Sequence, residues 1–254
     1  MLLALDVGNS QLYGGVFVDG VIGLRFRYTS KSSTSDEFGL FLKQVLRENQ
    51  YDPNQVTAIG ICSVVPQLDY SLRAACLKYL NLEPFFLQSG VKTGLNIKYR
   101  NPGEVGADRI ANAIAAVHLY PQTHLIIIDF GTATTFCAIT ANKEYLGGAI
   151  LPGVRLSVDA LSQNTAKLPA VEIVKVKNVI GRSTIESIQA GLYYGTLGTC
   201  REIITCIKQQ TFAGQNAVVL ATGGFSALFD NQNIYDHHLP DLVLDGLRLA
   251  VAMN

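Results

Sequence analysis

The sequence has little charge and no excess of either sign. Only 16% of its 254 residues are Asp, Glu, Lys or Arg, and 20 basic residues balance 20 acidic ones. Because soluble domains typically carry about 25% charged residues, this composition, with 48% apolar residues, argues against disorder. The zero net charge argues against a nucleic-acid coat and against membrane attachment by charge alone. Any anion that the protein binds must therefore be held by local chemistry.

Long apolar runs, paired cysteines and targeting signals are missing as well. No stretch approaches the ~18 uninterrupted apolar residues that a membrane span needs. The five cysteines are scattered and never spaced Cys-x-x-Cys, which argues against disulfides and structural zinc and favours reduced thiols. The first residues have neither a basic flank nor a cleavage site. We therefore expect a soluble, cytoplasmic protein that contacts neither membrane nor nucleic acid.

Strands and helices alternate in the first part of the chain. The predicted elements, in order, are a buried strand over 2–5 that stops at Asp6, a hairpin over 12–28 with its turn at Asp19-Gly20, a helix capped by Thr34 and Glu37, a buried strand over 56–62, and a helix opened by Pro66.

The opening pattern then returns: Asp6 falls on Asp129 and Gly8 on Gly131, an offset of 123 residues. A later buried strand, 217–221, takes the place that 56–62 has in the first part. Internal repeats define architecture, and the economical interpretation is an α/β protein of two similar halves, 1–119 and 120–254, facing each other across a cleft.

Each repeated strand ends in an Asp-x-Gly turn, which combines three useful groups. The carboxylate can hold a cation, the glycine lets the backbone approach a ligand, and the following amides and hydroxyls can donate to phosphate oxygens. A single such turn is a weak signal, but two at equivalent positions predict a clamp around a polyphosphate. A third turn, Gly223-Gly224, suits the flat face of an adenine. Neither a P-loop nor a G-x-G-x-x-G after a strand is present.

The segment from Tyr99 to Arg109 allows two interpretations. Asp108 can be an ordinary residue of a helix's first turn, favoured by the helix dipole, with Arg109 in a surface ion pair. Alternatively, Asp108 accepts the proton of a substrate hydroxyl while Arg109 grips a carboxylate. Phosphoryl transfer suits the second interpretation, because a base that orients the hydroxyl is sufficient there.

Taken together, these motifs resemble the type III pantothenate kinases, within the actin, sugar kinase and heat-shock chaperone ATPase superfamily, over essentially the whole chain. The resemblance is carried by the segments 6–10, 106–109, 129–134, 147–148 with 152–153, and 191–195. Ser10 stands where the family usually has Thr, and Ala107 where Pro is common. The resemblance implies a duplicated actin-like (ribonuclease H-like) fold around a nucleotide cleft.

The resemblance also implies an activity: ATP-dependent phosphorylation of pantothenate to 4′-phosphopantothenate, the first step of coenzyme A biosynthesis, by a homodimer. Asp108 would be the general base. The residues expected to bind ATP are Asp6, Val7, Gly8, Asn9, Ser10, Gln11, Leu12, Tyr13 and Thr132. Those expected to bind pantothenate are Tyr99, Gly106, Ala107, Asp108, Arg109 and Thr184, the last across the dimer interface. Asp6 would help place Mg²⁺, and Asp129 would bind K⁺ or NH₄⁺.

Other features carry less weight. Ser183 and Glu186 predict a second capping box, opening a helix to about Gln209. Gly191, Gly195 and Gly198 on that helix indicate a close helix contact, either in a dimer or within one subunit. We interpret His237-His238 as exposed loop residues rather than metal ligands.

Two other functions stay open at this point. One is a kinase for a different small hydroxylated metabolite, which would keep the phosphate turns and change the acceptor site. The other is a non-catalytic regulatory or accessory factor on the same scaffold, although a mere binder would need no base at Asp108.

Overall fold

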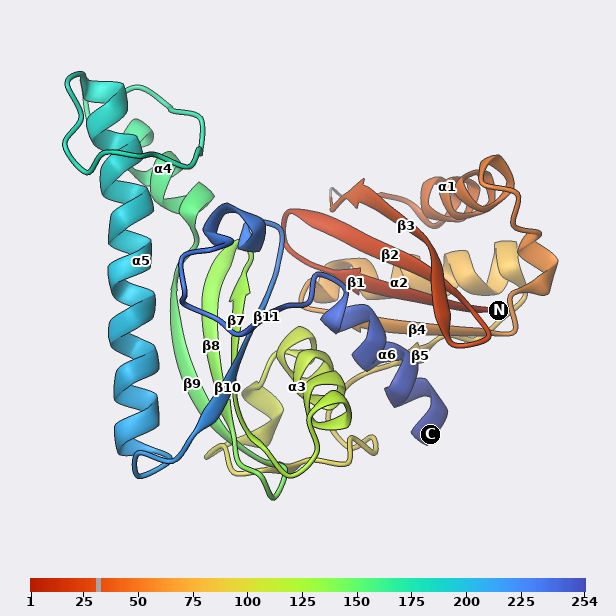
Figure 1. The fold of residues 1–254 in the computed structure, drawn as a ribbon. Coiled ribbons are helices and arrows are strands. Elements are labelled where there is room, and N and C mark those ends of the chain that lie inside the picture. The colour runs from red at the N-terminus through yellow and green to blue at the C-terminus, as the bar shows by residue number, and fades with distance from the viewer. Residues whose placement is uncertain (31–32) are drawn as a thin grey trace. The chain divides into compact units, whose positions relative to one another are not determined.

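The computed structural model describes residues 1–30 and 33–254. The chain divides into two compact units, each with its own β-sheet (Figure 1). The first unit comprises Met1–Leu95, Arg100–His118 and Asp241–Asn254, and the second comprises Asn96–Tyr99 and Leu119–Pro240. Among the described residues, no helix is long and apolar enough to cross a membrane.

The sheet of the first unit has the strand order β3-β2-β1-β4-β5. Its strands are β1 (Leu2–Val7), β2 (Gln11–Val18), β3 (Val21–Thr29), β4 (Ala58–Ser63) and β5 (Phe85–Phe86). The first three pair antiparallel, whereas β4 and β5 run parallel to β1. Asp19 and Gly20 have positive φ angles of 50° and 81°, so they form the tight turn that the Asp-Gly pair predicts for the hairpin.

Helices cover both faces of this sheet (Figure 1). On one face, α1 (Ser35–Glu48) and α2 (Pro66–Ala75) pack on the alternate residues Leu3, Leu5 and Val7 of β1. The predicted capping box at the start of α1 is present, with both reciprocal bonds between Thr34 and Glu37.

On the other face lies the last helix, α6 (Leu242–Met253), which contacts β1 and β4. Gly60 of β4 makes room for it, because a Cβ there would lie 2.7 Å from Val251 Cγ2. Helix α3 (Ala107–Leu119) approaches α6 equally closely, since a Cβ on Gly246 would lie 1.9 Å from the Ala111 carbonyl oxygen.

The sheet of the second unit repeats the first. Its order is β11-β10-β7-β8-β9-β6, where β7, β8, β9, β10 and β11 correspond to β1, β2, β3, β4 and β5 in both position and direction. The bounds are β6 (Asn96–Ile97), β7 (His124–Phe130), β8 (Ala133–Ile139), β9 (Glu144–Pro152), β10 (Ala217–Thr222) and β11 (His237–His238). The duplication predicted from the Asp-x-Gly repeat is therefore confirmed at the level of sheet topology.

Two further helices belong to the second unit, α4 (Val154–Gln163) and the long α5 (Thr184–Gln210). Helix α5 packs Tyr193, Leu197 and Cys200 into the core formed with β7 and β8. Its predicted capping box is only half formed: Ser183 Oγ accepts from the Glu186 amide, but Glu186 Oε2 accepts from the Arg182 amide instead of the cap residue's. Short helical turns complete the chain at Pro53–Gln55, Cys76–Leu80, Pro102–Glu104 and Ser226–Phe229.

The compact units and the predicted halves 1–119 and 120–254 differ at Leu119, which belongs to the second unit, and in two longer segments. The C-terminal residues from Asp241 onwards belong to the first unit, because the apolar face of α6 is buried against β1 and β4. Residues 96–99 belong to the second unit, because β6 pairs with β9. The strand predicted over 2–5 is also longer than expected, since Asp6 and Val7 continue the ladder opposite Tyr13 and Leu12.

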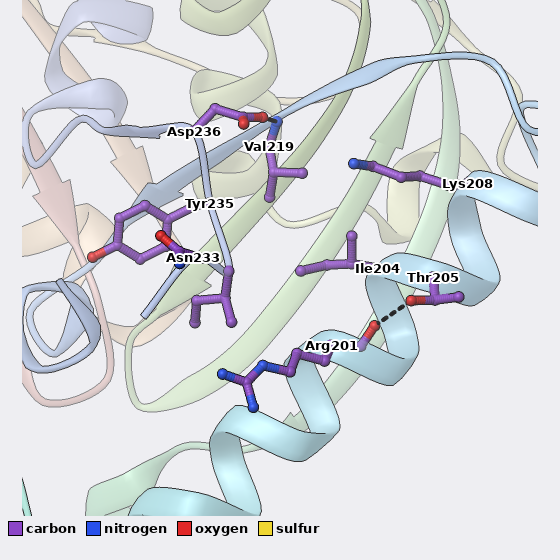
Figure 2. Close-up of a pocket in the computed structure, with 9 residues that line it drawn as sticks. Arg201, Ile204, Thr205, Lys208, Val219, Asn233, Tyr235 and Asp236 are labelled. Atoms are coloured by element: carbon purple, nitrogen blue, oxygen red, sulfur yellow. Dashed lines mark hydrogen bonds between the residues drawn. The ribbon is translucent and has the colours of Figure 1, made fainter. Parts of the chain in front are cut away.

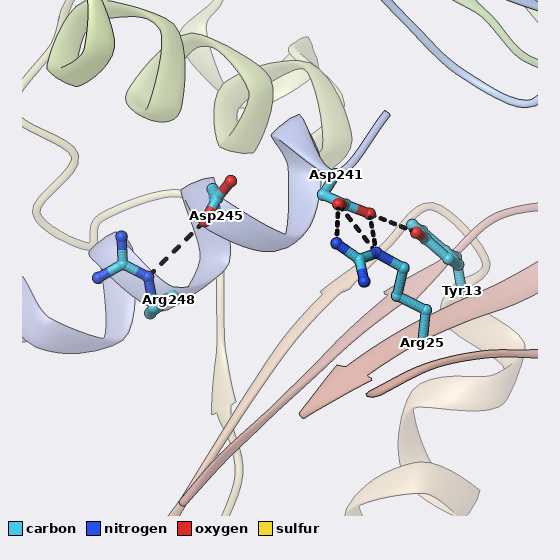
Figure 3. Close-up of polar contacts among 5 residues, drawn as sticks. All are labelled: Tyr13, Arg25, Asp241, Asp245 and Arg248. Atoms are coloured by element: carbon cyan, nitrogen blue, oxygen red, sulfur yellow. Dashed lines mark hydrogen bonds and ion pairs between the residues drawn. The ribbon is translucent and has the colours of Figure 1, made fainter. Parts of the chain in front are cut away.

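A charged cluster fastens the start of α6 to the β2–β3 hairpin (Figure 3). Asp241 Oδ1 accepts a 2.6 Å bond from the Tyr13 hydroxyl, and Arg25 Nη2 donates to Oδ2 at 2.6 Å. Burial alone would raise the pKa of Asp241, but the bonds from Arg25 and Tyr13 outweigh it, and the pKa falls below its ordinary value. Burial and then the Asp241 bond raise the pKa of Tyr13 to about 12.

We predict that Asp241→Asn destabilises the protein by about 1–3 kcal/mol at pH 7, since charge-assisted bonds are lost. An Asp whose pKa is lower in the folded state contributes fully to the free energy of unfolding at pH values above its unfolded-state pKa of about 3.9. This contribution disappears as the pH falls through the folded-state pKa. Urea unfolding of the unmodified chain and of Asp241→Asn should therefore give a smaller difference in the free energy of unfolding near pH 3.5 than at pH 7. The control Asp245→Asn, which loses only a 3.8 Å pair with Arg248, should have a smaller effect. An equal loss for Asp241→Asn at both pH values would contradict this role.

Candidate active site

The first Asp-x-Gly turn joins β1 to β2. The Gly8 amide donates to the Gln11 carbonyl at 3.1 Å, and a Cβ on Gly8 would lie 3.2 Å from that same oxygen. Asn9 and Ser10 form the exposed tip. The prediction that this turn binds a ligand concerns these exposed residues.

Three of the predicted ATP-binding residues have side chains directed elsewhere. Val7 and Leu12 are buried in the core, 0% and 1% exposed, so only their backbone could touch a ligand. The Tyr13 hydroxyl is bound to Asp241. On this strand pair, the predicted ATP-binding residues that are not buried in the core or bound to Asp241 are Asp6 and residues 8–11.

Asp6 is surrounded by groups from the neighbouring strands. It stands in register with Tyr13 on β2 and with Cys62 on β4, and Cys62 Sγ lies 3.1 Å from Asp6 Oδ1. Burial, and then the negative charges of Asp6 and Asp108, raise the pKa of the Cys62 thiol well above its usual value. The thiol is therefore a neutral donor to the Asp6 carboxylate. Sequence reasoning did not identify this contact, because nothing in the local pattern links residues 56 positions apart.

Asp108 lies in the first turn of α3, where the helix-dipole interpretation placed it. Its Oδ1 accepts a 2.7 Å bond from the Arg109 amide. Burial raises the pKa of Asp108, although the Arg109 amide and the Arg109 charge oppose the shift. Position 106 requires a glycine, because a Cβ there would lie 2.6 Å from Asp108 Oδ1. The glycine thus leaves the space that the folded-back carboxylate occupies.

Arg109 is not a surface residue, because only 6% of it is exposed. The mundane interpretation of a surface ion pair is therefore wrong. An arginine this deep in the protein is costly unless its charge is balanced. Ala107, the residue before Asp108, opens α3 and is half-buried.

The second Asp-x-Gly turn joins β7 to β8 in the same manner. The Gly131 amide donates to the Ala133 carbonyl at 3.1 Å, and Thr132 is exposed at the tip. Gly153 passes behind this turn: its amide donates to the Thr132 carbonyl, and a Cβ there would lie 2.4 Å from the Gly131 carbonyl oxygen.

Asp129 at this turn is covered by the end of β10. It stands in register with Thr222, as Asp6 does with Cys62. The next residue, Gly223, has a φ of 91°, and a Cβ on it would lie 2.3 Å from Asp129 Oδ1. Gly223 is therefore required by the backbone and by the Asp129 carboxylate, whereas Gly224 faces open space.

The remaining predicted pantothenate residues lie in the second unit. Tyr99 packs on Gly147 of β9, whose φ is 123° and whose Cβ would lie 3.2 Å from the Tyr99 ring. Thr184 is the first residue of α5 and is exposed.

Comparison with known proteins identifies the family. A family model described as type III pantothenate kinase matches residues 2–206. A type III pantothenate kinase of Legionella pneumophila (strain Philadelphia 1) is 67% identical over 254 residues, which cover 100% of this chain and 99% of that protein. Another, of Elusimicrobium minutum, is 50% identical over 255 residues, with 100% and 99% covered. The chain belongs to the type III pantothenate kinases.

Solved structures support the fold of this kinase. A Campylobacter jejuni protein described as a Baf family transcriptional activator has a TM-score of 0.63 at 18% identity, covering 98% of this chain and 97% of that chain. A ROK family glucokinase from Streptomyces griseus, in complex with glucose and AMPPNP, has a TM-score of 0.52 at 13% identity, covering 100% and 99%. At such identities the likeness concerns the fold alone, and it confirms the duplicated α/β architecture.

The carboxylates suit a metal that needs few protein ligands. Within residues 1–30 and 33–254, no group of three or more His, Cys, Asp or Glu side chains could hold a metal ion. Mg²⁺ retains several waters and is commonly held by one or two carboxylates together with substrate phosphates. The Asp6 carboxylate offers hard oxygen donors of this kind.

A pocket of about 300 Å³ lies apart from these residues, between α5 and the segment 233–236 (Figure 2). Arg201, Thr205 and Lys208 of α5 line one side, and Tyr235 and Asp236 line the other. None of the predicted site residues contributes to its lining.

We predict that Gly223→Ala destabilises the kinase by about 2–4 kcal/mol, because a Cβ at positive φ is strained and would collide with Asp129. The matched control Gly224→Ala should change stability by less than about 1 kcal/mol, since its Cβ meets nothing. Urea unfolding of both variants checks this. Equal free energies of unfolding for Gly223→Ala and Gly224→Ala would mean that residue 223 does not lie close to Asp129.

Proposed function

We propose that the chain transfers the γ-phosphoryl group of ATP to the primary hydroxyl of pantothenate, forming 4′-phosphopantothenate in the first step of coenzyme A biosynthesis. The observation that carries this proposal is the 67% identity over the whole chain to type III pantothenate kinases. The geometry of Asp108 and of the two glycine turns supports it.

In this proposal the two turns bind the phosphates of ATP. The amide of Asn9, the hydroxyl of Ser10 and the tip at Thr132 donate to phosphate oxygens, as turn amides do in anion-binding nests, and Gly8 lets the backbone approach the ligand. Val7, Gln11, Leu12 and Tyr13 belong to the same binding segment through their backbone. This arrangement would explain how a chain of zero net charge holds a strongly anionic substrate.

Asp108 is the proposed base. Its Oδ1 accepts from the Arg109 amide, and in this proposal Oδ2 takes the proton of the pantothenate hydroxyl. As the proton moves to Asp108, the pantothenate hydroxyl oxygen bonds to the γ-phosphorus. The bond between the γ-phosphorus and the β–γ bridging oxygen breaks, which releases ADP. Arg109 is the proposed partner of the pantothenate carboxylate, and Tyr99, Gly106, Ala107 and Thr184 complete the substrate site.

Two cations belong to the proposal. Asp6 would hold Mg²⁺, and Asp129 would bind K⁺ or NH₄⁺. Both ions would offset the phosphate charge that a P-loop lysine neutralises in other kinases. Asp129 is well suited to a fixed ion because Gly223 confines its carboxylate on one side.

A coupled assay of ADP release tests the function. We expect turnover with pantothenate and background rates with glucose, with N-acetylmannosamine and without an acceptor. Turnover with a sugar alone would identify a different kinase. No acceptor-dependent turnover at all would favour a regulatory role.

We predict that Asp108→Asn lowers kcat by about 10²–10⁴-fold, the usual contribution of a general base, while ATP affinity is retained. Glu104→Gln, an exposed acid in the same segment, is the matched control and should remain active. The acid limb of kcat/KM for the unmodified enzyme should lie above the ordinary Asp value of about 3.9, because burial raises the pKa of Asp108 and the base must be ionised. Near-normal turnover of Asp108→Asn would remove it as the base.

We predict that replacing K⁺ with Na⁺ lowers turnover by about 10²-fold, the scale of one lost preorganised electrostatic contact, and that NH₄⁺ restores it. Asp129→Asn should make the residual rate indifferent to the cation. Steady-state rates in chloride salts of constant ionic strength measure both effects. An unmodified enzyme that works equally in sodium alone would refute the assignment.

A homodimer is also proposed, and the exposed face of α5 supports it. Gly191, Gly195 and Gly198 lie on this face, and a Cβ on any of them would meet nothing within 4 Å. Glycines cost about 1 kcal/mol each in a helix interior, and no contact among the described residues of this chain accounts for them. Packing against a partner's helix would do so, and would bring Thr184 to the partner's substrate site. The cytoplasmic location also remains part of the proposal, supported by five cysteines that form no disulfide with one another.

We predict sedimentation at about twice 27.5 kDa for the unmodified chain. Gly195→Leu should shift the protein to the monomer and reduce activity, although leucine favours the helix by about 1 kcal/mol over glycine. Sedimentation velocity and the ADP assay measure these effects. An active monomer would contradict a shared substrate site.

A further inference from the structure

A chain of polar contacts in the second unit leads from β11 to the Gly223-Gly224 turn. The Ser226 hydroxyl donates to the Gly223 carbonyl at 2.6 Å. His238 Nε2 lies 2.7 Å from the same hydroxyl oxygen, and His238 Nδ1 lies 3.3 Å from Asp230 Oδ1. The expectation of two exposed loop histidines is therefore wrong for His238, which forms β11 with His237 and is only 26% exposed at its side chain.

The order Ser226, His238, Asp230 has the spacing of a nucleophile, a base and an orienting carboxylate. It lacks the access that a nucleophile needs, because Ser226 is 1% exposed. Its proton is also engaged, since the Gly223 carbonyl can only accept. The arrangement therefore acts within the protein and not on a substrate.

Proton counting assigns the direction of the contacts. Ser226 has one hydroxyl proton, and it is directed to the Gly223 carbonyl. The proton between Ser226 and His238 must therefore come from Nε2. By donating to the Ser226 hydroxyl oxygen, His238 orients the serine so that its own proton is directed to the Gly223 carbonyl.

Tyr235 closes the network. Its hydroxyl lies 2.5 Å from Asp230 Oδ1 and 3.2 Å from the Ser226 carbonyl. Burial and then the bond to Asp230 raise the pKa of the Tyr235 hydroxyl. Both ends of the short helical turn Ser226–Phe229 are thus tied to the segment that carries β11.

What the network fixes is the position of Gly223 against Asp129. A Cβ on Gly223 would lie 2.3 Å from Asp129 Oδ1, and the Phe225 amide donates to the Phe130 carbonyl at 3.1 Å. Any displacement of the turn therefore changes the space around the Asp129 carboxylate.

We propose that His238 is a positioning residue: through Ser226 it holds the Gly223-Gly224 turn against Asp129 and thereby sets the affinity for the nucleotide and the monovalent cation. This inference rests on the proposed function in one respect, the assignment of this turn and of Asp129 to the ATP and cation site. His238 touches no substrate itself.

The test compares His238→Ala with His238→Gln, whose amide nitrogen can replace Nε2 as the donor to Ser226. His237→Ala is the matched control, because His237 is exposed and its ring stacks on Tyr120 at 5.2 Å. Losing one net hydrogen bond corresponds to about three- to tenfold in an equilibrium constant. We expect His238→Ala to raise KM for ATP and the K⁺ concentration for half-maximal rate by about that factor.

A merely structural role would not give the same pattern. KM for pantothenate should stay within about twofold, and His238→Gln should recover most of the ATP affinity, because the donor is restored. Tyr235→Phe, which removes only a hydroxyl, should shift KM for ATP in the same direction and serves if His238→Ala does not fold. An unchanged KM for ATP in a folded His238→Ala or Tyr235→Phe variant would overturn the proposal. Equal increases in KM for ATP and in KM for pantothenate would overturn it as well.

Calorimetric titration with AMPPNP separates this proposal from the proposed function, since it needs no turnover. If the unmodified chain does not phosphorylate pantothenate but His238→Ala still weakens AMPPNP binding, the positioning role stands and only the acceptor is wrong. If the unmodified chain is active and His238→Ala binds AMPPNP normally, the positioning role fails alone.

Discussion

The structure depends on one constraint that occurs twice: an aspartate at the end of a central strand stands in register with the end of a parallel neighbour. Asp6 lies beside Cys62, and Asp129 lies beside Thr222. Parallel strands end at the same edge, so the turns that follow must lie next to a carboxylate. In the first unit a neutral thiol donates to that carboxylate, and in the second a glycine passes over it.

Close approach of the backbone to a carboxylate also explains two glycines that have no regular role in a strand or helix. Gly106 gives space to Asp108, and Gly223 gives space to Asp129. Both place backbone against a carboxylate oxygen, which a side chain would displace. A site of this kind can bind an anion without a cluster of basic side chains, because amides and bound cations supply the positive character. Zero net charge is therefore compatible with ATP as the substrate.

Much of the fold was predictable because its signals are local. The Asp19-Gly20 hairpin, the Thr34–Glu37 capping box and the repeat of Asp6 at Asp129 each depend on residues close in sequence or on one pattern found twice. The return of α6 to the first unit was not predictable in this way, since it depends on contacts of α6 with β1 and β4. The links Asp6–Cys62 and Ser226–His238 likewise arise only when separate strands are brought together.

The central proposal is that both Asp-x-Gly turns bind phosphates of ATP. A crystal structure of the chain with AMPPNP, Mg²⁺ and Tl⁺, a potassium substitute with anomalous scattering, tests it most directly. The account predicts phosphate oxygens on the amides of Asn9 and Ser10 and on Thr132, with Tl⁺ at Asp129. Phosphates bound to one turn alone, or Tl⁺ bound away from Asp129, would contradict it.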